Sequence, residues 1–187
     1  MSISSFGSLP NLISLLRLVL VPIVISMIVT DRWIGAFLIF VAAGISDGVD
    51  GWLANRFNLR TELGAYLDPL ADKALIVSIY VTMGIAGAIP RWLVILVVSR
   101  DIMIVSAVIL SWVVDKPVPL RPLMVSKLNT VAQIVLAGVV MAALGFDFDA
   151  SVAMMVLTPL VAALTLLSVA FYVAEWVRHM NAADLGP

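Results

Sequence analysis

The sequence predicts an all-α integral membrane protein with six transmembrane helices. Of its 187 residues, 63% are hydrophobic and only 12% are charged, and the mean hydropathy is +1.14. A water-soluble domain of this length cannot bury so much apolar surface, because a small domain leaves a large share of its residues at the surface. Polar breaks also divide the chain into six apolar runs, each long enough to cross a bilayer as a helix of about 20 residues. Lipid is therefore the expected solvent for most of the chain.

The predicted helices end where charged residues, glycines or prolines interrupt the apolar runs. Asp31 and Arg32 end the first run, Gly87 to Pro90 separate the third from the fourth, and residues 115–122 form a polar, proline-rich connection. Pro22 and Pro159 lie inside runs, where membrane helices tolerate proline. The six predicted spans are Asn11–Thr30, Trp33–Ala54, Leu63–Ala86, Arg91–Val114, Leu123–Gly145 and Ser151–Val177.

The distribution of basic residues predicts that both termini are cytoplasmic. Cytoplasmic connections are enriched in Lys and Arg. Arg32 and Arg91 are the basic residues of one set of connections. The connections after the second and fourth spans, with the start of the fifth span and the C-terminal tail, hold Arg56, Arg60, Lys116, Arg121, Lys127 and Arg178. All five tryptophans fall near predicted helix ends, where an amphipathic ring favours the membrane interface.

Composition excludes several other classes of protein. The chain has no cysteine, which rules out disulfides, thiolate catalysis and cysteine-ligated zinc. The net charge is −1 and no basic tail is present, so nucleic acid is not an expected partner. No Lys or Arg precedes the first apolar run, so we do not expect a cleavable signal peptide. Without an internal repeat or a second compositional region, a single membrane domain over residues 1–187 is expected.

Four aspartates lie within one short stretch of an otherwise largely apolar sequence. Asp47 and Asp50 are spaced i, i+3, and Asp68 and Asp72 are spaced i, i+4, so each pair shares one helix face. A short polar turn joins the two helices, which should run antiparallel and bring the carboxylates together. Four like charges cannot all stay ionised at low dielectric without help, so either some are protonated or cations neutralise them. Carboxylate oxygens without His or Cys suit Mg²⁺, Mn²⁺ or Ca²⁺.

Two other interpretations of the aspartates remain open from the residues alone. The carboxylates could be solvated at helix ends, although ionisable groups at membrane depth are costly and usually functional. They could also line a cation pathway of a transporter. The glycines Gly48, Gly51 and Gly64 favour neither interpretation. Missing side chains at these positions would let a bulky ligand approach the backbone.

The aspartate stretch resembles the signature of the CDP-alcohol phosphotransferase family. That signature reads Asp-x-x-Asp-Gly-x-x-Ala-Arg, eight residues, Gly, three residues, Asp, three residues, Asp. The chain matches it, with the spacing intact, at Asp47, Asp50, Gly51, Ala54, Gly64, Asp68 and Asp72. It departs at the arginine position, which holds Asn55 and is followed by Arg56. A six-helix membrane chain of this length agrees with the resemblance from end to end.

The resemblance implies a reaction and a set of site residues. An alcohol attacks the β-phosphate of a CDP-linked lipid and releases CMP, with two divalent cations, Mg²⁺ or Mn²⁺, held by the aspartates. Asp47, Asp50 and Asp68 would be metal ligands, and Asp72 would be both a ligand and the general base. The implied nucleotide-binding positions are Asn11, Ser14, Gly51, Asn55, Arg56, Thr61 and Gly64. With Asn55 at the arginine position, the charge facing the diphosphate could come from Arg56, Arg60 or Arg17.

Three basic residues outside the signature form a candidate pocket for an anionic acceptor alcohol. Arg100 lies in mid-helix beside Asp101, at a depth where an Arg–Asp pair needs partners in the protein. With Arg121 and Lys127 it could bind the acceptor's phosphate. A structural ion pair for Arg100 and an interfacial anchor for Lys127 are the alternatives.

Segments beyond the signature resemble the cardiolipin synthase branch of the family. They include the stretch from Ser99 to Ile104 and that from Val125 to Thr130. That branch joins CDP-diacylglycerol to phosphatidylglycerol and gives cardiolipin and CMP. Phosphatidylglycerophosphate synthases, the alternative, use glycerol 3-phosphate and more often carry Ala-Arg-Glu where this chain has Ser99-Arg100-Asp101. A cation transporter and a non-catalytic scaffold are remoter alternatives. The resemblance also implies a homodimer, and a bacterial inner membrane with the site toward the cytoplasm is the expected location.

Overall fold

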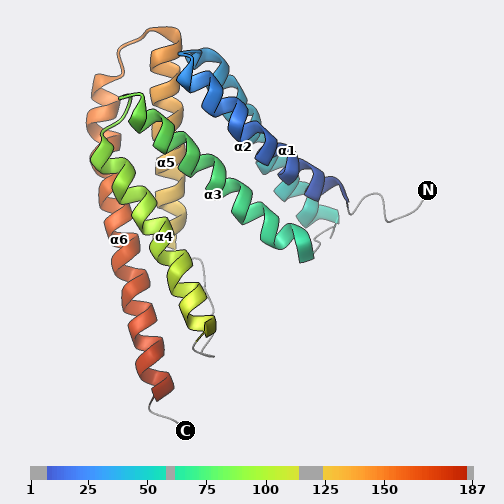
Figure 1. The fold of residues 1–187 in the computed structure, drawn as a ribbon, viewed down its shortest axis with the longest axis vertical. Coiled ribbons are helices and arrows are strands. Elements are labelled where there is room, and N and C mark those ends of the chain that lie inside the picture. The colour runs from blue at the N-terminus through green and yellow to red at the C-terminus, as the bar shows by residue number, and fades with distance from the viewer. Residues whose placement is uncertain (1–7, 58–61, 114–123, 185–187) are drawn as a thin grey trace, which may run out of the picture. The chain divides into compact units, whose positions relative to one another are not determined.

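The computed structural model describes residues 8–57, 62–113 and 124–184, with side chains at 16, 18–46, 48, 73–106 and 124–178. Over these residues the chain forms α-helices joined by turns (Figure 1). The helices are α1 (Ser8–Val29), α2 (Trp33–Phe57), α3 (Glu62–Ile85), α4 (Arg91–Val113), α5 (Met124–Phe146) and α6 (Ser151–Asp184). The predicted all-helical fold with six helices is confirmed.

The helix bounds agree with the apolar runs except where polar residues continue a helix. Helix α2 runs three residues past the predicted end, to Phe57, and α6 continues from Val177 to Asp184. Backbone hydrogen bonds within a helix do not require apolar side chains, so a helix can leave the apolar region without ending. Pro22 and Pro159 lie inside α1 and α6, as the sequence predicts.

Three helices end in a left-handed residue followed by a bond back across the last turn. The left-handed positions are Asp31 (φ 55°), Gly87 (φ 76°) and Asp147 (φ 54°). After Asp31, the Arg32 N–H donates to the Met27 carbonyl over 2.8 Å. This 6→1 bond is that of a Schellman motif, which satisfies a carbonyl that the helix leaves open. The turn predicted at Asp31–Arg32 is thereby explained.

The chain divides into two compact units, and the first consists of Met1–Ile89 with Ala137–Ala150. In this unit α1 packs against both α2 and α3. The C-terminal half of α5 packs on the start of α2, where the rings of Phe37 and Phe146 meet edge to face with centroids 5.8 Å apart. The core side chains recur at helical spacing and include Val24, Ile28, Ala36, Phe40, Leu75, Ile79, Met83 and Val140. This unit carries the aspartate stretch.

The second unit consists of Pro90–Leu136 with Ser151–Pro187. Here α4 packs against α6 (Figure 1). The buried face of α4 carries Leu93, Val97 and Arg100, and that of α6 carries Val161, Thr165 and Ser168. Both sets follow an i, i+4, i+7 pattern, which places each set on one helix face. The interior of this unit is therefore partly polar, and it contains Arg100.

Much of the described surface is apolar. Among the described residues, two helical segments are long and apolar enough to cross a membrane, Met124–Phe146 and Ser151–Arg178, and only 17% of the most apolar part of the second is buried. Met155, Val152 and Ile85 are each at least three-quarters exposed. Side chains of this kind would associate in water. This surface indicates a membrane protein.

Candidate active site

The four aspartates lie on consecutive helices of the first unit. Helix α2 continues through Asp47 and Asp50, and α3 carries Asp68 and Asp72 in its first three turns. The i, i+3 and i, i+4 spacings therefore fall on continuous helical backbone. The four carboxylates lie outside the described side chains, so their convergence on metal ions stays a prediction. Where side chains are described, no group of three or more His, Cys, Asp or Glu could hold a metal.

The predicted nucleotide-binding residues come from the same helices. Asn11 and Ser14 lie on α1, which packs against both aspartate-bearing helices. Gly51, Asn55 and Arg56 lie on α2, and Gly64 on α3, with side-chain positions outside the described set; Thr61 lies wholly outside the described residues. Arg17, on α1, and Arg60 likewise stay predictions. Helix α1 therefore lies against the two helices that carry most of the predicted site residues.

Arg100 is the centre of a buried polar cluster in the second unit. Its Nη1 lies 2.5 Å from Asp101 Oδ1, and its Nε and Nη2 donate to Ser168 Oγ over 3.2 and 2.9 Å. Nη2 also donates to Ser126 Oγ. The guanidinium carbon lies 5.9 Å from the centroid of the Tyr172 ring, within cation–π range. One side chain therefore joins α4 to α5 and α6.

The predicted acceptor-binding cations differ in exposure. The side chain of Arg100 is only 2% exposed, whereas Lys127 is exposed in the first turn of α5. The structure links the two through Ser126, which accepts from Arg100 and immediately precedes Lys127. Arg121 lies outside the described residues. The structure contains the ion pair between Arg100 and Asp101. This pair is compatible with a purely structural role for Arg100 and with a role in binding the acceptor.

A second polar contact lies deeper between α5 and α6. Thr165 Oγ1 donates to Asn129 Oδ1 over 3.0 Å, and both residues are fully buried. Ser126 and Asn129 lie in the segment from Val125 to Thr130 that carries the resemblance, but no role was predicted for either. Thr165 and Ser168 were not predicted as polar contacts. The signal was present, because polar residues recur at helical spacing on two otherwise apolar helices.

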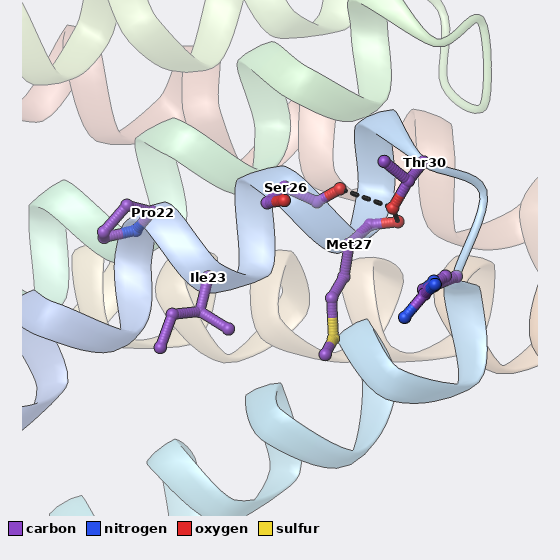
Figure 2. Close-up of a pocket in the computed structure, with 6 residues that line it drawn as sticks. Pro22, Ile23, Ser26, Met27 and Thr30 are labelled. Atoms are coloured by element: carbon purple, nitrogen blue, oxygen red, sulfur yellow. Dashed lines mark hydrogen bonds between the residues drawn. The ribbon is translucent and has the colours of Figure 1, made fainter.

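A groove of about 480 Å³ lies along α1, at the end remote from Asn11. Figure 2 shows its lining, Pro22, Ile23, Ser26, Met27, Thr30 and Arg32, with the Thr30 hydroxyl donating to the Ser26 carbonyl over 2.7 Å. Arg32 adjoins the start of α2, and Asp47 follows 14 residues after Trp33, roughly 20 Å along a helix. The groove is therefore not part of the predicted aspartate site.

The model of the CDP-alcohol phosphatidyltransferase family matches residues 7–176, which include α1 to α5, most of α6 and all four aspartates of the signature. The chain belongs to this family. The resemblance identified from the aspartate spacing is thus confirmed.

Several curated relatives in the CDP-alcohol phosphatidyltransferase family match most of the chain. It is 33% identical to "Cardiolipin synthase (CMP-forming)" of Homo sapiens over 166 residues, 80% of this chain and 55% of the relative. It is 34% identical to "CDP-diacylglycerol–glycerol-3-phosphate 3-phosphatidyltransferase 1, chloroplastic" of Oryza sativa subsp. japonica, over 70% of this chain and 45% of the relative. The chain spans about half the length of these relatives. The relatives therefore include proteins named as cardiolipin synthases and one whose name specifies glycerol 3-phosphate.

Proposed function

We propose that the chain transfers a phosphatidyl group from CDP-diacylglycerol to phosphatidylglycerol, giving cardiolipin and CMP. The observation that carries the proposal is the intact aspartate signature, which falls on the consecutive helices α2 and α3 inside a family match over residues 7–176. Relatives named cardiolipin synthase match 80% of the chain or more. The Ser99-Arg100-Asp101 sequence supports the same branch.

The donor set fits divalent cations. Asp47, Asp50, Asp68 and Asp72 offer hard carboxylate oxygens from two helices, the ligand type that Mg²⁺ and Mn²⁺ favour. We therefore assign these four residues as ligands of two divalent cations. When bound, such cations neutralise phosphate charge and stabilise the leaving group of phosphoryl transfer.

Asp72 is assigned as the general base. Its carboxylate accepts the proton of the acceptor hydroxyl while the hydroxyl oxygen forms a bond to the β-phosphorus of CDP-diacylglycerol. The bond from this phosphorus to the oxygen that bridges the two phosphates breaks, and CMP leaves with the bonding electrons. Gly51 and Gly64 leave room for the nucleotide, with Asn11, Ser14, Asn55, Arg56 and Thr61 as its polar contacts.

The net charge of the proposed acceptor pocket comes from Arg121 and Lys127. Because Arg100 is paired with Asp101, the pair adds no net charge to the proposed acceptor pocket of Arg100, Arg121 and Lys127. Lys127 is exposed and forms no ion pair with another described residue. A phosphodiester carries one negative charge, whereas a phosphomonoester carries about −1.5 to −2 at neutral pH. Arg121 and Lys127 bring two further positive charges to the proposed pocket, so its charge suits either acceptor.

Phosphatidylglycerophosphate synthase is the second candidate. The observation in its favour is the match to the Oryza relative, whose name specifies glycerol 3-phosphate. Both acceptors present a glycerol hydroxyl near a phosphate, so one site could serve either.

The proposed enzyme is a single domain over residues 1–187 with six transmembrane helices and cytoplasmic termini. The Lys and Arg distribution supports this orientation, and it puts the aspartate ends of α2 and α3 on the cytoplasmic side. We also propose that the enzyme lies in a bacterial inner membrane and forms a homodimer.

The test is an assay with two acceptors in parallel. The purified chain receives CDP-diacylglycerol and Mg²⁺ or Mn²⁺, with either phosphatidylglycerol or glycerol 3-phosphate, and mass spectrometry identifies the lipid product. We expect cardiolipin in the first arm. Phosphatidylglycerophosphate in the second arm alone would support the second candidate, and no CMP in either arm would refute both.

A further inference from the structure

We infer that Asn129 is a specificity-determining residue of the acceptor site, donating its amide N–H groups to an oxygen of the acceptor's phosphate beside Arg100. This inference rests on the proposed function and deepens it, because it assigns a role to a buried side chain that the family signature does not contain. It follows from three features of the second unit: an amide nitrogen without a partner, its position relative to Arg100, and the one guanidinium donor that remains for a ligand.

The Asn129 amide is only half satisfied. Its Oδ1 accepts the Thr165 hydroxyl over 3.0 Å, which fixes the orientation of the amide. Its Nδ2 is fully buried and has no hydrogen-bond partner among the described residues. Buried donors in folded proteins are nearly always paired, and an unpaired one is costly to retain. A ligand oxygen would satisfy this group.

Asn129 lies one helical turn from the Arg100 cluster on both neighbouring helices. On α5, Ser126 accepts from Arg100 three residues before Asn129. On α6, Ser168 accepts from Arg100 three residues after Thr165, the partner of Asn129. The amide and the guanidinium are therefore about 5 Å apart along the bundle, within the span of one phosphate and its ester oxygens.

Arg100 has one donor left for a ligand. A guanidinium carries five N–H groups. The bonds of Nε to Ser168, of Nη2 to Ser168 and Ser126, and of Nη1 to Asp101 use four of them. The remaining Nη1 hydrogen and the two Asn129 Nδ2 hydrogens are all hydrogen-bond donors. A phosphate oxygen accepts and does not donate, so it matches this set.

Ser126 and Asn129 lie on one face of α5. They are spaced i, i+3, so their side chains point to the same side of the helix. Ser126 is half-buried and Asn129 is buried. The face that carries the unpaired amide is therefore the face that contacts Arg100 through Ser126.

The test compares Asn129→Leu with wild type under steady-state conditions, with phosphatidylglycerol and glycerol 3-phosphate as separate acceptors. Leucine has a similar volume and brings no buried donor. We expect the KM for the productive acceptor to rise about tenfold, as for loss of a hydrogen bond to a charged group. The KM for CDP-diacylglycerol should not change. Because the buried Thr165 hydroxyl loses its Asn129 acceptor in this variant, a moderate fall in unfolding temperature is expected and does not bear on the inference.

Thr130→Val is the matched control. Its hydroxyl donates to the Ser126 carbonyl of its own helix over 3.1 Å, so its removal should leave both KM values unchanged. Asn129→Ala is the second variant if leucine prevents folding, with the same expected rise in acceptor KM. An active wild type with unchanged acceptor KM in both Asn129 variants would overturn this inference alone. A uniform loss of kcat with no change in the acceptor KM would also overturn it. An inactive wild type would overturn the proposed function and this inference with it.

Discussion

Arg100 and Asp101 form an ion pair inside the second unit, with 2.5 Å between Nη1 and Oδ1 and side chains that are 2% and 8% exposed. Neighbouring residues on a helix point about 100° apart, and the long Arg100 side chain spans this difference to contact Asp101. Its other donors then reach Ser126 on α5 and Ser168 on α6. A pair between adjacent residues thereby links three helices.

Arg100→Leu should destabilise the protein by about 3–5 kcal/mol, because it removes the guanidinium partner of a buried carboxylate. The measurement is chemical or thermal unfolding of the purified chain. Arg32→Gln is the control, since Arg32 is exposed and such surface changes usually stay within about 0.5 kcal/mol. Arg100→Leu with Asp101→Leu should recover much of the loss. Equal stability of Arg100→Leu and Arg32→Gln would contradict the described network.

Gly145→Ala should destabilise the first unit. A Cβ at Gly145 would lie 2.9 Å from the Ile34 backbone nitrogen, where α5 crosses the start of α2. Overpacking against backbone typically costs about 1–3 kcal/mol. Gly44→Ala on α2 is the control, because its Cβ would meet nothing within 4 Å; it should be neutral or stabilising by up to about 1 kcal/mol. The measurement is the unfolding temperature of each variant. An unchanged unfolding temperature for Gly145→Ala would argue against this close contact.

Asp72→Asn should abolish transfer and leave the fold intact, since it removes the proposed base and one metal ligand. Loss of a general base alone lowers kcat by about 10²–10⁴-fold. CMP release measures activity, and circular dichroism checks folding. Asp147→Asn is the control, because Asp147 is exposed at φ 54°, a conformation that asparagine also tolerates. Normal turnover by Asp72→Asn would remove Asp72 from the mechanism.

Chelation should stop activity reversibly. The four aspartates hold the proposed cations, and without them the carboxylates repel one another and the substrate diphosphate. Excess EDTA should reduce CMP release to background, and Mg²⁺ or Mn²⁺ added beyond the chelator should restore it. Ca²⁺ at the same concentration serves as a comparison of cation size. Full activity in excess chelator would exclude the metal role.

Most of the fold could be predicted from the sequence because a membrane environment limits the structures that a long apolar segment can adopt. In lipid, backbone groups must bond within the segment, so each long apolar run becomes a helix. The breaks at Asp31–Arg32 and Gly87 coincide with left-handed helix ends. The predicted sixth span ends at Val177, whereas α6 continues to Asp184. Spans were predicted from apolar runs, and the polar end of α6 does not continue such a run. The family was indicated by the resemblance of the stretch from Asp47 to Asp72 to the family signature, and the family match confirms it.

The contacts of the second unit could not be predicted in the same way. Arg100 and Ser168 are 68 residues apart, and their contact depends on the rotation of α4 and α6 about their axes. Apolar runs that face lipid on one side and protein on the other contain little information about that rotation. The same applies to Asn129 and Thr165, whose roles emerge only once the helices are packed.

The central claim is transfer from CDP-diacylglycerol to phosphatidylglycerol, and product stoichiometry tests it most directly. The purified chain would receive CDP-diacylglycerol, Mg²⁺ or Mn²⁺ and phosphatidylglycerol with a deuterated headgroup, and mass spectrometry would count cardiolipin and CMP. The account predicts one CMP per cardiolipin, with the deuterium retained in the cardiolipin. Cardiolipin formed without CMP, or no CMP from active preparations with either acceptor, would contradict it.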